Sequence, residues 1–108
     1  SGTMSFSVDS IAYFVSNKNG VDFYLIDGKQ VTSNSEFSDI EDLLNDKRFI
    51  LVSDILLVSR KCIAKATPEG KDAFVLELYP KFPYPVMVVG DYAATIRSLI
   101  DKSKPEEK

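Results

Sequence analysis

A long apolar run over residues 49–63 constrains the fold more than any other feature of this chain. One polar pair, Ser53-Asp54, interrupts the run, and apolar residues resume immediately after it. Short apolar runs that are bounded by turn residues are typical of strands buried in a sheet or sandwich. The run therefore predicts two neighbouring strands joined at Ser53-Asp54, and it favours a mainly β protein.

The first third of the chain has the pattern of a β-meander. Side chains alternate over residues 11–16, which places the odd-numbered residues on one face, and they alternate again over residues 21–26. Asn19-Gly20 and Asp27-Gly28 are strong signals for the tight turns of hairpins. The polar stretch over residues 29–33 then predicts a third strand at the edge of the sheet.

Two short helices are predicted. Ser38 and Glu41 have the spacing of a capping box, with Ser35 as an alternative cap, and this predicts a helix over residues 37–44. A second helix is predicted over residues 92–101, with Asp91 as its N-cap. Its packing stripe is expected to consist of Tyr92, Ile96, Leu99 and Ile100.

The remaining segments complete the β pattern. Strands are predicted over residues 61–66, 73–79 and 86–89. Prolines exclude residues 80–85 from a central strand, because proline cannot donate to the ladder. We expect this segment to be a stiff connection whose aromatic residues cap the core. A docking segment for a partner domain and a platform for single-stranded nucleic acid are the alternatives.

The composition argues against an enzyme and against a membrane-spanning protein. The 108 residues carry 13 Lys and Arg, 16 Asp and Glu and no His, giving a net charge of −3. The commonest general base and metal ligand is therefore missing, and the glycines form no phosphate-binding loop. The one cysteine, Cys62, is expected to be a buried thiol in a reducing compartment. We expect a non-catalytic, cytoplasmic domain without cofactor, metal or membrane span.

The order of these elements resembles the LytTR family of bacterial DNA-binding domains over about residues 10–100. The resemblance is carried by the opening Ile11-x-Tyr13-Phe14, the Asp27-Gly28 turn, the helix from Ser38, the interrupted strand pair, and a closing strand that enters a terminal helix. It implies a mainly β fold, an elongated stack of three small antiparallel sheets with two short helices. Residues 5–101 are then one domain, residues 1–4 a cloning remnant, and residues 102–108 a polar tail.

The resemblance also implies a function. Family members are DNA-binding output domains of two-component response regulators, which control transcription, and they usually follow a receiver domain. They contact duplex DNA through loops between strands, in successive major grooves, and can act as homodimers. Carried over by position, the contact sites are the turn after the first strand, the Ser53-Asp54 break, and the junction at residues 88–92. The side chains expected at the DNA are Asn17, Lys18, Asn19, Lys47, Arg48, Ser53 and Lys61.

At two of these three sites the chain departs from the family pattern. Leu51 and Asp54 stand where the family has arginines, and Ser53 stands for a His or Asn. Val89 and Gly90 replace a Ser and an Arg at the junction. With a net negative charge, these losses leave a second hypothesis open. The chain could be a protein-interaction module on the same scaffold that no longer binds DNA.

Two observations separate these hypotheses. An exposed apolar patch built from Leu51, Ile55 or Val89 at the contact face would favour the interaction module. A continuous basic strip at that face would favour DNA, because neutralised phosphates supply most of the non-specific affinity.

Overall fold

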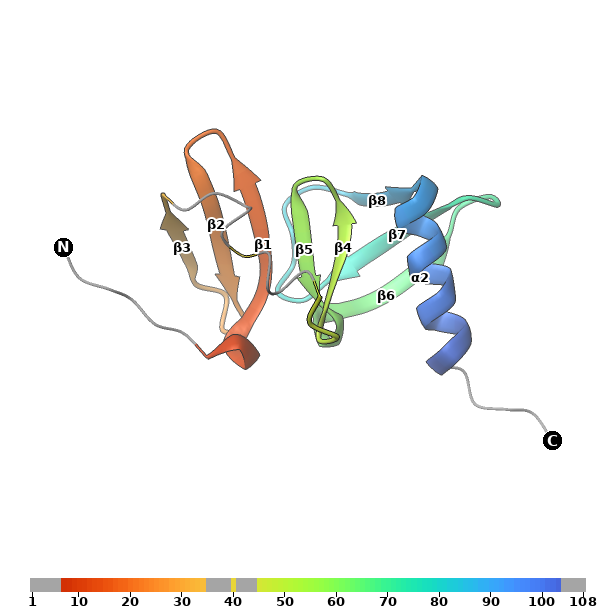
Figure 1. Ribbon diagram of the computed structural model, residues 1–108, viewed down its shortest axis with the longest axis horizontal. Coiled ribbons are helices and arrows are strands. Elements are labelled where there is room, and N and C mark those ends of the chain that lie inside the picture. The colour runs from red at the N-terminus through yellow and green to blue at the C-terminus, as the bar shows by residue number, and fades with distance from the viewer. Residues whose placement is uncertain (1–6, 35–39, 41–44, 104–108) are drawn as a thin grey trace.

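The computed structural model of the protein describes residues 7–34, 40 and 45–103, and most of these residues lie in strands (Figure 1). The strands are β1 (Ile11–Asn17), β2 (Gly20–Leu25), β3 (Gln30–Ser33), β4 (Phe49–Ser53), β5 (Leu56–Ser59), β6 (Ile63–Pro68), β7 (Ala73–Leu78) and β8 (Val86–Val89). Helix α2 spans Gly90–Ser103, and the 3-10 helices are η1 (Val8–Ser10) and η3 (Arg60–Cys62). The helix predicted over residues 37–44 lies, apart from Ile40, outside the described residues.

The first sheet has five antiparallel strands in the order β3-β2-β1-β5-β4. The predicted meander and the predicted edge position of its third strand are confirmed. The apolar run forms β4 and β5, which are joined at Asp54 and Ile55, so the predicted strand pair is also confirmed. The first and last residues of the run therefore lie at the open end of this hairpin. The polar break lies at its turn.

The strict alternation predicted for the first strand is wrong. A β-bulge lies between Ile11, which pairs with Leu25, and Tyr13, which pairs with Tyr24. The extra residue shifts the side chains by one position, because a bulge opposes two residues to one. Ile11 and Phe14 consequently share one core cluster, although an odd and an even position were expected on opposite faces.

The second sheet has three antiparallel strands in the order β6-β7-β8. The described residues thus form two sheets, whereas three were expected. The strand predicted from Lys61 begins two residues later, because residues 60–62 form η3. Cys62 is buried as predicted, at 3% exposure, but in this 3-10 turn rather than in a strand.

Helix α2 begins at Gly90, so Asp91 lies inside its first turn and not at the predicted N-cap position. The predicted packing stripe is present in part. Ile96 is buried, Tyr92 and Leu99 pack against the core, and Ile100 is exposed. None of the described helices is long and apolar enough to cross a membrane.

The core lies between the sheets and under α2. Its larger cluster joins buried residues of β1, β4, β5, β7, β8 and α2, and a smaller cluster covers the other face of the five-stranded sheet. Tyr13 stacks on Tyr24 with ring centroids 4.8 Å apart, and its hydroxyl donates to the Pro80 carbonyl at 2.9 Å. Phe82 packs on both rings, so the connection between β7 and β8 contacts the first sheet, and Phe82 helps to cap the core whereas Tyr84 is exposed.

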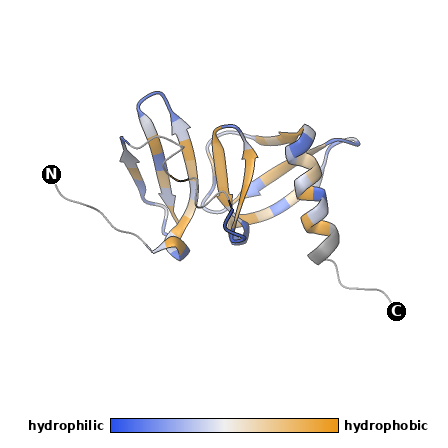
Figure 2. Cartoon of the chain, in the orientation of Figure 1, coloured by the Kyte–Doolittle hydropathy of each residue, from blue (hydrophilic) through white to orange (hydrophobic). Residues whose placement is uncertain are grey.

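The molecule is elongated, with principal extents of 56 × 27 × 24 Å. Figure 2 shows hydrophobic residues along β4 and β5, whereas the β1–β2 turn and the residues that precede β4 are hydrophilic. Hydrophilic residues are therefore concentrated at the ends of these strands, at two opposite edges of the molecule (Figure 2).

Candidate nucleic-acid interface

Three connections lie along one long edge of the molecule. They are the β1–β2 turn, the β4–β5 turn and the junction between β8 and α2, which all reach the upper edge in Figure 1. We call this the loop edge, made of residues 17–19, 53–55 and 89–90. The three sites that the resemblance implies are therefore brought together by the fold, in a row along its long axis.

The β1–β2 turn presents three polar side chains to solvent. Asn17, Lys18 and Asn19 are all exposed, and the Asn17 Oδ1 accepts a hydrogen bond from the Asn19 backbone N–H at 2.7 Å. Gly20 makes this tight turn possible, with φ of +149° and an added Cβ that would lie 2.0 Å from the Ser33 carbonyl oxygen. Lys18 forms no ion pair within the described part of the chain. Its charge is available to an external anion.

Hydrogen bonds hold the β4–β5 turn on both sides. The Ser16 backbone N–H donates to the Ile55 carbonyl at 2.8 Å, which attaches the turn to β1. The Ile55 N–H in turn donates to Ser53 Oγ at 3.2 Å. On the other side, the Tyr92 hydroxyl of α2 donates to Asp54 Oδ1, and this bond raises the pKa of the Tyr92 phenol. The middle turn is thus fixed relative to the other two.

The contact between Asp54 and Tyr92 is one that sequence reasoning missed. The two residues are 38 positions apart, and no spacing rule connects a turn to a distant helix. A weak signal was available, since Tyr92 was expected in the packing stripe and an amphipathic tyrosine commonly finds a polar partner for its hydroxyl.

At the third site the structure offers cations that the sequence did not suggest. Val89 and Gly90 carry no side-chain donor, but Lys71 and Arg97 line a hollow of about 570 Å³ beside Gly90. The Arg97 guanidinium donates to the Lys71 carbonyl at 2.8 Å and lies 5.1 Å from the centre of the Phe74 ring. Its position is set by packing, while the Lys71 ammonium is exposed.

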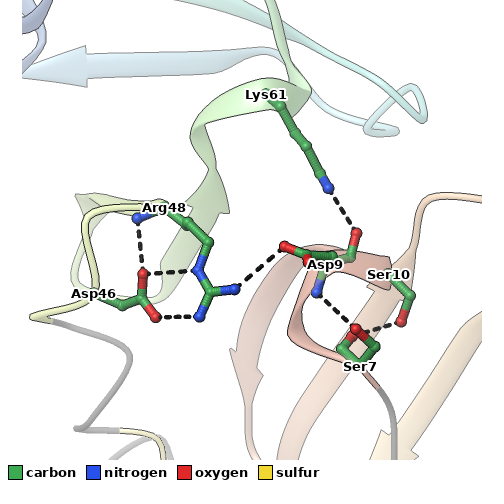
Figure 3. A network of polar contacts seen from close by, with 6 residues as sticks. All are labelled: Ser7, Asp9, Ser10, Asp46, Arg48 and Lys61. Atoms are coloured by element: carbon green, nitrogen blue, oxygen red, sulfur yellow. Dashed lines mark hydrogen bonds and ion pairs between the residues drawn. The ribbon is translucent and has the colours of Figure 1, made fainter.

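Arg48 and Lys61 lie at the opposite end of the β4–β5 hairpin (Figure 3), and Lys47 immediately precedes Arg48 in the chain. We call the group made of Asp9, Asp46, Arg48 and Lys61 the ionic end. Along an extended strand of roughly 3.3 Å per residue, Arg48 and Ser53 are about 16 Å apart. The predicted grouping of Ser53 with Lys47 and Arg48 is therefore wrong in space, because sequence neighbours at the two ends of a strand are not spatial neighbours.

The donors of the ionic end are engaged within the protein. Arg48 Nε and Nη2 donate to the two carboxylate oxygens of Asp46 at 3.0 and 2.8 Å, and its Nη1 reaches Asp9 Oδ1 at 3.3 Å. Lys61 Nζ donates to the Asp9 carbonyl at 2.7 Å. The hydrogen bonds from Arg48 lower the pKa of Asp46 to about 2, and Asp46, with a smaller contribution from Asp9, raises the pKa of Arg48. The network fastens η1 to the start of β4 and to η3.

An apolar patch of the three expected residues is not formed at the loop edge. Leu51 is only partly exposed and packs against the smaller core cluster. Ile55 and Val89 are each 53% exposed, one in the β4–β5 turn and one at the end of β8. Single exposed apolar residues are normal on protein surfaces, so they do not favour the interaction module.

The described residues contain no group of three His, Cys, Asp or Glu side chains that could hold a metal ion. Burial raises the pKa of the Cys62 thiol, which makes it a poor nucleophile at neutral pH. What the loop edge can supply is hydrogen bonding and charge.

Comparisons with known proteins agree with this arrangement. The model of the family described as LytTr DNA-binding domain matches residues 1–101. Among solved structures, the chain is similar to the LytTr DNA-binding domain of a protein described as a methyl-accepting/DNA response regulator from Bacillus cereus. The TM-score is 0.67 at 20% identity, over 84% of this chain and 81% of that chain. At that identity the likeness concerns the fold. The comparison with curated proteins found no match.

Proposed function

The chain belongs to the LytTr DNA-binding domain family, and from this premise we propose that it is the DNA-binding output domain of a bacterial transcription regulator. It binds duplex DNA with the loop edge, and the turns between its strands enter the grooves. Half or more of the hydrogen bonds in such complexes go to the backbone, and base edges supply the sequence information.

The observation that carries this proposal is the row of three exposed turns along one edge of an elongated molecule. Its long axis of 56 Å exceeds the roughly 34–36 Å that separates successive major grooves on one face of the duplex. Hydrogen bonds from Ser16 to Ile55 and from Tyr92 to Asp54 keep the turns in fixed relative positions. A rigid row along a molecule of this length suits two grooves and the backbone between them.

The contacts we propose follow from exposure and from free donors. Asn17, Lys18 and Asn19 enter one groove, and the Ser53 hydroxyl serves the middle of the interface. Lys71 adds a phosphate contact near the junction of β8 and α2. Arg48 and Lys61 are assigned instead to holding the ionic end, because they already donate to Asp46 and Asp9. Lys47 is left out of the interface because it precedes β4, at the end of the hairpin away from the loop edge.

The partners follow from the same proposal. The domain receives its signal from a receiver domain of the same regulator and acts in the cytoplasm. Two copies bind one operator as a homodimer, with half-sites about one helical turn apart. No cofactor takes part.

The test is fluorescence anisotropy with a labelled random pool of duplex DNA, repeated at about 50 and 200 mM salt. We expect binding that weakens steeply as salt rises, since several phosphates are neutralised. A single-stranded pool of equal length is the control, and it should bind more weakly because the loop edge requires duplex grooves. Absence of duplex binding even at the lower salt would overturn the proposal.

A further inference from the structure

Asp54 has an unusual position for a DNA-binding surface. It is exposed in the middle turn of the loop edge, and it forms no ion pair within the described part of the chain. A carboxylate that faces phosphates is repelled by them, so its presence in the centre of the edge weakens binding unless a donor meets it. The inference below rests on the proposed function.

The carboxylate of Asp54 is held in one orientation. Tyr92 donates its hydroxyl to Oδ1, and Oδ2 accepts no hydrogen bond from the other described residues. The turn beneath it is fixed as well, because the Ile55 N–H bonds Ser53 Oγ and the Ile55 carbonyl accepts from Ser16. An acceptor that is fixed before binding loses little side-chain freedom when a ligand donor arrives.

Base amino groups are the donors that a duplex offers to such an acceptor. In the major groove these are the N4 amino group of cytosine and the N6 amino group of adenine. Adenine also places its N7 acceptor beside N6, where it would repel a carboxylate, whereas an amide side chain bonds both atoms. A single carboxylate oxygen therefore suits cytosine.

We infer that Asp54 is a specificity-determining residue that accepts a hydrogen bond from the N4 amino group of one cytosine, and that Tyr92 is its positioning residue. The residue that stands for a family arginine thus reverses the polarity of the contact. An arginine donates to guanine, and Asp54 accepts from cytosine, the other base of the same pair.

The experiment is selection of sites from a random duplex pool by the wild-type chain and by Asp54→Asn. The wild-type sites should share a cytosine at one fixed position, preferred over other bases by about tenfold or more. Asp54→Asn should lose this preference and shift it toward adenine. Asp27→Asn is the matched control, since it removes an exposed acid from the turn between β2 and β3, at the other end of β2 from the loop edge, and it should keep the cytosine.

Tyr92→Phe tests the positioning role. It should reduce the preference for cytosine by several-fold while binding of random duplex stays close to that of the wild type. A merely structural role would lower both together. Circular dichroism and thermal melting show whether each variant is folded.

The outcomes distinguish this inference from the proposed function. If Asp54→Asn and the wild type select the same bases, the inference is wrong although the domain binds DNA. If Tyr92→Phe leaves the cytosine preference intact, the positioning role is wrong. If no folded variant binds any duplex, the proposed function fails and the inference fails with it.

Discussion

Cationic residues have different roles near the two ends of the β4–β5 hairpin. At the ionic end, Arg48 and Lys61 direct their donors to Asp46 and Asp9 and fasten three segments together. At the loop edge, Lys18 is exposed without an ion pair among the described residues. The difference teaches that a cation counts toward binding only when the fold leaves its donors unused. The net charge of −3 is therefore a poor guide to what the loop edge can bind.

The distinction also separates stability from recognition along one strand pair. Changes at the ionic end should alter folding while binding is retained. Changes at the loop edge should alter binding. Gly20, next to the β1–β2 turn, is an exception, because a substitution there also strains the backbone.

That exception gives the largest expected effect. Gly20→Ala would place a Cβ 2.0 Å from the Ser33 carbonyl oxygen, at a backbone φ of +149°. We expect the free energy of unfolding to fall by about 2–4 kcal/mol, measured by urea denaturation, because β1, β2 and β3 must all shift. DNA binding should weaken as the turn is displaced.

Gly28→Ala is the matched control at the turn between β2 and β3. Its φ is +94°, and an added Cβ would meet nothing within 4 Å. Only the left-handed conformation is penalised there, which costs about 1–2 kcal/mol. Equal losses in the two variants would show that the close approach to Ser33 is not the cause.

The next effect concerns the two lysines that sequence analysis treated alike. Lys18→Ala should weaken binding of random duplex several-fold and lower the salt slope by about one, because one phosphate contact is lost. Lys47→Ala, at the other end of the hairpin, should leave both affinity and slope unchanged. Anisotropy titrations at several salt concentrations measure both. A larger loss of duplex affinity in Lys47→Ala than in Lys18→Ala would show that the ionic end, and not the loop edge, contacts DNA.

A smaller effect is expected for Arg48→Ala, and it should appear in stability. The variant removes the contacts to Asp46 and Asp9, so the melting temperature should fall slightly. The fall is small because exposed ion pairs contribute little. Arg60→Ala, which loses one hydrogen bond to the Lys47 carbonyl, is the control. If Arg48→Ala instead reduced the salt slope of DNA binding, Arg48 would be a phosphate contact after all.

The smallest effect is a pH dependence. Hydrogen bonds from Arg48 hold the pKa of Asp46 at about 2, below its ordinary 3.8. A lowered pKa stabilises the fold above the unfolded value and loses that contribution as pH falls through the folded value. Stability should therefore drop between about 3.8 and about 2, and this part of the drop should be missing in Asp46→Asn. Urea midpoints across this range test it, and parallel curves for the two proteins would contradict it.

Much of the fold could be predicted because its signals are local. Asn19-Gly20 locates the first turn of the meander to within one residue, since the two residues between β1 and β2 are Lys18 and Asn19, and Asp27-Gly28 lies in the second turn. The polar pair Ser53-Asp54 locates the turn between β4 and β5, at Asp54 and Ile55, equally closely. Such turns depend on backbone conformations that few residue types adopt, so a few neighbouring residues in the sequence suffice to locate them. The positions of the three loop-edge sites along the chain came instead from the resemblance to the family.

What failed depended on contacts between distant segments. The bulge after Ile11 shifts the faces of β1, and it is stabilised by packing on both sides of a central strand. The bond from Tyr92 to Asp54 and the bond from Lys61 to the Asp9 carbonyl join residues that no local pattern relates. Residues close in sequence, Arg48 and Ser53, were separated by the length of β4.

The sequence by itself determined a mainly β chain, the succession of strands along it and the terminal helix, and its resemblance indicated the family. The strands and the helix rest on side-chain periodicity and on turn residues, which act over a few positions. Only the tertiary structure decided which polar groups are left to bind a partner. That choice depends on whether a distant segment, such as η1 beside Arg48 or α2 beside Asp54, brings a partner within hydrogen-bond distance.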